Sequence, residues 1–129
     1  MPPGDALSET QRSRLARSVA TAEESTGLRF RLHVGRLEGG RTGAESLLAA
    51  SGATAPDTVL VAVDPAARGL EIVTGTRATG QVSDRTCALA ALAMTSSFAA
   101  GDLVGGLVNG LQILAEHGRR QHVLHLDRA

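Results

Sequence analysis

The sequence predicts an α/β protein, a three-layer α/β/α sandwich built around a small mixed β-sheet. Three observations lead to this prediction. Five consecutive apolar residues, Val59 to Val63, end at Asp64, which is typical of a strand buried on both faces. A turn sequence, Asp-Pro-Ala-Ala-Arg-Gly, then leads into a second strand at residues 70–74. Segments with helical periodicity precede and follow this hairpin, so we expect helices to cover the sheet.

The segments before the hairpin predict a helix, a strand and a second helix. Ser8 and Gln11 have the spacing of a capping box, which predicts a helix that begins there and ends at Gly27. Residues 28–37 alternate at first between apolar and polar side chains, which favours a half-buried strand. Residues 43–51 predict a short helix that returns the chain to the sheet.

The order of these elements predicts the topology of the sheet. The right-handed crossover rule makes strands 28–37 and 58–64 parallel, and the short turn makes strand 70–74 antiparallel to its neighbour. Two further helices complete the sandwich. The first is capped by Ser83 or Asp84 and runs to about residue 99, and the second begins at Gly101-Asp102 and runs to about residue 116. The first of them is expected to present a stripe to the core that consists of Cys87, Ala90, Met94 and Phe98, flanked by Leu89 and Ala93.

Length and composition limit the domain organisation and the class of function. A chain of 129 residues predicts one domain, which we place at residues 8–116, with an N-terminal arm at 1–7 and a C-terminal tail at 117–129. The net charge is zero and only 2% of residues are aromatic, which argues against nucleic-acid binding. The single cysteine excludes an internal disulfide.

Membrane and secretion signals are not visible in the sequence. No apolar run reaches the ~18 residues of a transmembrane helix, and the first residues lack the basic and apolar regions of a signal peptide. We therefore expect a protein that is cytoplasmic or peripheral to a membrane. The oligomeric state stays open at this point.

Acidic residues are predicted to gather at the end of the sheet where the hairpin turn lies. Glu38 and Asp64 follow the two parallel strands, and Asp102 follows the helix that returns to the same end. Carboxylate oxygens suit Ca²⁺ or Mg²⁺, so these three are candidate metal ligands, with Arg68 of the turn as a candidate ligand-binding residue. The alternative is plain structure, in which Asp64 forms a turn, Asp102 caps a helix, and Asp64 and Arg68 form a surface ion pair of little energy.

Asp84 is a second candidate ligand-binding residue, at the opposite end of the sheet. A helix that rises ~1.5 Å per residue separates it from the turn by about 25 Å. It is expected near Thr74, Thr76 and Arg77, with helix capping as the alternative role. Cys87 falls in the first turn of the same helix but on its apolar stripe, which favours a buried structural thiol over a reactive one.

Three segments resemble the TPM domain family and, more closely, the uncharacterised actinobacterial DUF5130 group. They are VLVAVDPAARGLEIVTG at 59–75, VSDRTCALAALAM at 82–94 and FAAGDLVGGLVNGLQIL at 98–114. The resemblance implies an α/β/α sandwich and the role of an accessory or interaction domain, and some relatives are linked to Ca²⁺ binding or phosphatase activity. This chain has Gly75-Thr76-Arg77 where the family has an aromatic residue between two glycines, which weighs against phosphatase activity.

The function we expect is that of a non-enzymatic binding module with a protein partner and an optional divalent cation at Asp64 and Asp102. This expectation follows from the resemblance and from the lack of a Gly-x-Ser-x-Gly sequence or a phosphate-binding loop. The alternative is a weak phosphatase that uses the same carboxylates and a metal ion. A third hypothesis is a structural or oligomerising domain.

Overall fold

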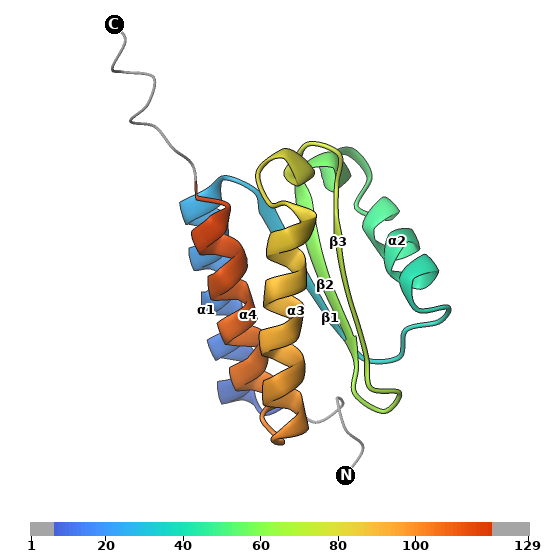
Figure 1. Ribbon diagram of the computed structural model, residues 1–129, viewed down its shortest axis with the longest axis vertical. Coiled ribbons are helices and arrows are strands. Elements are labelled where there is room, and N and C mark those ends of the chain that lie inside the picture. The colour runs from blue at the N-terminus through green and yellow to red at the C-terminus, as the bar shows by residue number, and fades with distance from the viewer. Residues whose placement is uncertain (1–6, 120–129) are drawn as a thin grey trace, which may run out of the picture.

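The computed structural model describes residues 7–119, which form a sheet with helices on both of its faces (Figure 1). The elements, in chain order, are α1 (Glu9–Thr26), β1 (Arg29–Val34), α2 (Arg41–Ala49), the 3-10 helix η1 (Gly52–Asp57), β2 (Thr58–Asp64), β3 (Gly69–Thr74), the 3-10 helix η2 (Ala78–Gly80), α3 (Asp84–Ala99) and α4 (Leu103–His117). The expected arm at 1–7 and tail at 117–129 lie almost wholly outside the described residues.

The sheet has the predicted topology. Its strand order is β1-β2-β3, with β1 parallel to β2 and β2 antiparallel to β3. Strand β1 ends at Val34, three residues before the predicted end at 37. The amide of Gly35 donates the last backbone hydrogen bond between the two strands, to the carbonyl of Val63. The amide of Leu37 donates instead to the carboxylate of Asp64. The chain therefore leaves the sheet earlier than the alternating pattern indicates.

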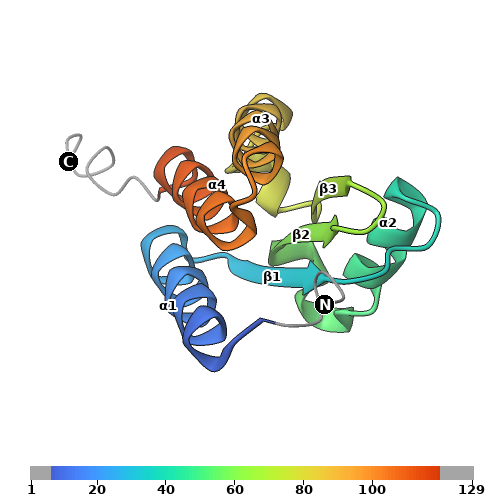
Figure 2. The ribbon, with the colours of Figure 1, turned by 90° about the horizontal axis from the view of Figure 1, so that it is seen from below.

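The middle strand divides two apolar cores, which makes the fold the predicted three-layer sandwich. Every residue of β2 is buried. Val59, Val61 and Val63 pack into the larger core with α1, α3 and α4, whereas Leu60 and Ala62 pack into the smaller core with α2. Figure 2 shows these three helices on one face of the sheet and α2 on the other. The continuous apolar run predicted this burial on both faces correctly.

Local signals set the helix ends. The Ser8–Gln11 capping box is present, with both of its hydrogen bonds at 2.9–3.1 Å. Gly27 ends α1 in the left-handed conformation, at φ 78°. The side chain of Ser83 accepts a hydrogen bond from the amide of Thr86 and so caps α3.

The buried face of α3 differs in part from the predicted stripe. Ala90 and Met94 are fully buried, but Leu89 is 45% exposed and Thr86 is buried in its place. The reason is the close packing of α3 on α4, where a side chain at Gly110 would meet Met94 Sδ at 2.7 Å. Such a close approach turns the face that contains Thr86, Ala90 and Met94 inward and leaves Leu89 at its margin.

Within residues 7–119, no helix is both long enough and apolar enough to cross a bilayer.

Candidate functional site

A cavity of about 480 Å³ lies where the turn between β2 and β3 meets the corner between α3 and α4, and we call it the turn–corner cavity. Its lining residues are Val63, Pro65, Arg68, Gly69 and Leu70 from the hairpin, and Thr95, Phe98, Ala99, Gly101 and Leu103 from the helical corner. A smaller hollow of about 260 Å³ lies between α1 and α4. The turn–corner cavity is at the predicted end of the sheet.

Asp64 shapes the hairpin side of the turn–corner cavity. One oxygen of its carboxylate accepts a hydrogen bond from the amide of Ala67 at 3.2 Å, and the other accepts one from the amide of Leu37 at 3.0 Å. The residue is only 9% exposed. Asp64 therefore holds the turn and ties it to the chain that follows β1, which is the structural role considered as the alternative to metal binding.

Arg68 is the charged residue among those that line the cavity. It is the one non-glycine residue in the described part of the chain with a left-handed backbone, at φ 55°. Its amide donates to the carbonyl of Pro65 at 3.2 Å and closes the turn. None of the ion pairs within residues 7–119 involves Arg68, so its guanidinium keeps its hydrogen-bond donors for solvent or a ligand.

Asp102 shapes the helical side of the cavity without lining it. Its carboxylate accepts a hydrogen bond from the amide of Gly105 at 2.8 Å, which caps α4. Gly101, at φ 87°, lets the chain reverse between the two helices. The hairpin turn and the α3–α4 corner meet as predicted. The cavity between them is lined by Arg68 and Gly101 and not by Asp64 or Asp102.

The predicted metal ligands have other partners in the structure. Glu38 forms an exposed ion pair with Arg36 at 2.9 Å, while Asp64 and Asp102 accept hydrogen bonds from backbone amides. In the region from 7 to 119, no group of three or more His, Cys, Asp or Glu side chains is placed to hold a metal ion. Cation binding by this set stays a prediction.

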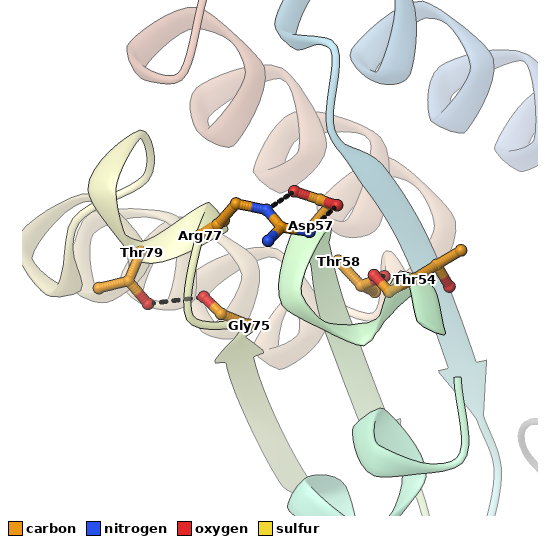
Figure 3. Close-up of polar contacts among 6 residues, drawn as sticks. All are labelled: Thr54, Asp57, Thr58, Gly75, Arg77 and Thr79. Atoms are coloured by element: carbon orange, nitrogen blue, oxygen red, sulfur yellow. Dashed lines mark hydrogen bonds and ion pairs between the residues drawn. The ribbon is translucent and has the colours of Figure 1, made fainter. Parts of the chain in front are cut away.

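A second polar cluster lies at the opposite end of the sheet (Figure 3). Two nitrogens of Arg77 donate to the two carboxylate oxygens of Asp57, each at 2.9 Å. The hydrogen bond from Arg77, together with its charge, lowers the pKa of Asp57 despite some loss of solvation, and the pKa of Arg77 is raised in turn. The backbone amide of Arg77 also donates a hydrogen bond to the carbonyl of Pro56. Arg77 therefore holds η1 against the chain that follows β3.

Asp84 was expected beside Arg77 at this end. It is the exposed first residue of α3, directly after the capping Ser83, while Arg77 binds Asp57. Asp57 does not stand out in the sequence, because an aspartate after proline and before a strand is ordinary turn chemistry. Arg77, the partner of Asp57, belongs to the Gly75-Thr76-Arg77 segment that departs from the family pattern. That departure is the sequence signal that could have pointed to this pair.

Gly75 brings two backbone segments together in the same cluster. Its amide donates to the carbonyl of Thr58 at 2.8 Å, and its carbonyl accepts from the hydroxyl of Thr79 at 2.9 Å (Figure 3). A methyl group at this position would lie 2.6 Å from the carbonyl carbon and oxygen of Pro56. The cluster therefore serves the structure of this end of the sheet.

Comparison with known families identifies the chain. A family model described as "Domain of unknown function (DUF5130)" matches residues 4–115. The chain belongs to the DUF5130 family. No curated protein is significantly similar to this DUF5130 domain in sequence.

Two solved structures share the fold of the DUF5130 domain. The BA42 protein of the psychrophilic bacterium Bizionia argentinensis aligns with a TM-score of 0.75 and 18% identity, over 90% of this chain and 83% of that one. The N-terminal domain of the cg2496 protein of Corynebacterium glutamicum aligns with a TM-score of 0.71 and 15% identity, over 91% and 82%. At these identities the likeness concerns the fold alone.

Apart from Arg68 and Thr95, the residues that line the turn–corner cavity of the DUF5130 domain are apolar. Its lining residues include no His, Cys, Asp or Glu among those described. The hydroxyl of Thr95 already donates to the carbonyl of Ala91 at 2.7 Å. Cys87, elsewhere on α3, is half-buried, and burial first and Asp84 second raise the pKa of its thiol, as suits a structural thiol.

Proposed function

We propose that this DUF5130 domain is a non-enzymatic binding module that acts through the turn–corner cavity. The observation that supports the proposal is the cavity itself, whose volume of about 480 Å³ falls within the range of small-ligand sites. Its walls are largely apolar and carry one cation, Arg68, which is the usual composition of a binding pocket. Its described lining offers no nucleophile with an adjacent base, so binding is favoured over catalysis.

The resemblance to the TPM domain supports the same role from the sequence. TPM domains resemble accessory or interaction modules, and a protein partner fits a cavity that opens at one end of the sandwich. We therefore also propose that this domain is related to the TPM domain and that it binds a protein partner.

Amide NMR shifts test the proposal directly. A mixture of small fragments added to the ¹⁵N-labelled chain should shift the amides of Gly69, Leu70 and Gly101, which line the cavity. Ala99 also lines it and is exposed, so Ala99→Trp should fill the space and abolish these shifts. Ala100→Trp is the matched control, because Ala100 is an exposed neighbour outside the lining.

The pattern of shifts decides the outcome. Shifts at the cavity that Ala99→Trp removes and Ala100→Trp keeps would support the proposal. An absence of shifts at all three amides, or shifts that survive in Ala99→Trp, would overturn it.

The divalent cation is tested separately. Titration with Ca²⁺ should shift the amides at Asp64 and Asp102 if their carboxylates bind the ion with their remaining lone pairs. No shift at millimolar Ca²⁺ would remove the metal from the proposal and leave the cavity in place.

A further inference from the structure

We infer that the turn–corner cavity takes a carboxylate joined to an apolar body, with the carboxylate on Arg68 and the body on the apolar wall. This inference rests on the proposed function and names the chemical class of its ligand. Three features of the cavity support it: its charge, the surroundings of that charge and the apolar side chains beside it.

The charge of the described lining is that of a single cation. Arg68 lines the cavity, whereas Asp64 and Asp102, which lie next in sequence to lining residues, do not. Both acids accept hydrogen bonds from backbone amides that hold the turn and the helix cap. The cavity therefore presents a positive charge, and a planar guanidinium binds a carboxylate with two parallel hydrogen bonds.

The backbone at Arg68 indicates that its side chain has a purpose beyond the turn. The left-handed conformation at φ 55° suits glycine or asparagine better than arginine. Glycine follows directly at position 69 but has no positive φ, so the left-handed position of this turn is occupied by the arginine itself. The arginine places a cation at the cavity at some conformational cost, and ligand binding gives that cation a role.

The apolar residues that line the cavity favour a hydrocarbon group as the other part of the ligand. Leu70, Phe98 and Leu103 line the cavity and are half-buried, so they keep apolar surface that a ligand can cover. Thr95 also lines it, but its hydroxyl already donates within α3 and has only acceptor capacity left. A carboxylate therefore finds its donors at Arg68, and a hydrocarbon group finds its contacts on the apolar side chains.

Octanoate and 1-octanol form a matched pair of probes. They share the same hydrocarbon chain and differ in the charged group. Octanoate should shift the amides of Gly69 and Leu70 and bind about tenfold more tightly than 1-octanol, since it adds a charge-assisted pair of hydrogen bonds. Acetate, which has the carboxylate without the chain, should bind at least about tenfold more weakly than octanoate.

Substitution of Arg68 tests its role without disturbing the turn. Asparagine tolerates the left-handed backbone, so Arg68→Asn should fold as the parent does. We expect it to lose the roughly tenfold preference for octanoate and to bind 1-octanol unchanged. Ala99→Trp should weaken both probes, and Ala100→Trp neither.

Two sources share this chemistry, a free medium-chain acid and the C-terminal residue of a protein partner. An acetylated tripeptide that ends in leucine, compared with its C-terminal amide, separates them. Tighter binding of the free-carboxylate peptide than of octanoate assigns the source to a chain end, and the reverse assigns it to a free acid.

The inference and the proposed function fail in different ways. Equal binding of octanoate and 1-octanol at the cavity, or an unchanged preference in Arg68→Asn, would overturn the ligand class and keep the binding module. Failure of both probes and the peptide to shift the cavity amides would also overturn the ligand class. The fragment mixture then decides the binding module independently.

Discussion

Replacement of Gly75 by alanine should be strongly destabilising, because two backbone segments touch at this residue. The added Cβ would lie 2.6 Å from the carbonyl carbon and oxygen of Pro56 and closer still to the carbonyl oxygen of Ala55. These atoms belong to the backbone of η1 and cannot turn aside as a long side chain would. Either η1 or the chain after β3 must move.

The displacement of η1 or of the chain after β3 sets the size of the loss in stability. Overpacking of a rigid site costs about 1–3 kcal/mol. The shift also strains the hydrogen bonds from the Gly75 amide to Thr58 and from the Arg77 amide to Pro56, each worth about 1 kcal/mol. We expect a loss of about 3 kcal/mol, which in a domain of this size lowers the melting temperature by about 10 °C.

Urea denaturation followed by circular dichroism measures this change, with Gly80→Ala as the control. Gly80 lies in η2, and a methyl group there would meet nothing within 4 Å. The control should unfold within about 1 kcal/mol of the parent. If Gly75→Ala is as stable as Gly80→Ala, the close approach of η1 to the end of β3 is wrong.

Three further substitutions and reactions test other parts of the structure. Asp64→Asn should lower the free energy of unfolding by about 2 kcal/mol in urea, because an amide group can accept only one of the two backbone hydrogen bonds; parental stability would contradict this role. Asp57→Asn should be less stable than the parent near neutral pH, and the difference should begin to shrink as the pH falls below about 3.8, because Arg77 lowers the pKa of folded Asp57 and the benefit is lost as the folded carboxylate is protonated; a difference that stays constant from pH 7 down to pH 2 would refute it. Cys87 should react slowly with a thiol reagent at pH 7.5 and faster as the pH rises, since burial and Asp84 raise its pKa; rapid reaction at pH 7 would show an exposed thiolate instead.

The fold was largely predictable because its main signals are local. The apolar run at 59–63 is typical of a strand covered on both faces, and the crossover rule then predicted the direction of its neighbour. The capping sequences at Ser8 and Ser83 place helix starts within a few residues. The end of β1 was predicted too late, because a side chain from β2 takes the amide of Leu37.

The site was predictable only in its position. The sequence brings the hairpin turn and the α3–α4 corner to the same end of the sheet, and the cavity lies there. It does not show that Asp64 and Asp102 use their carboxylates on nearby amides, or that Arg68 is the charge that lines the cavity. It marks Arg77 through the departure at Gly75-Thr76-Arg77, but it does not show that Arg77 pairs with Asp57, which lies 20 residues away.

The amino-acid sequence by itself determined most of the secondary structure and the two-sided burial of β2, since these depend on periodicity and caps that act over a few residues. The connections between the strands determined their order. Only the tertiary structure decided which polar groups are free to bind and which hold the fold together. That choice depends on distances between segments far apart in the chain, and a side chain's partners are set once those segments have packed.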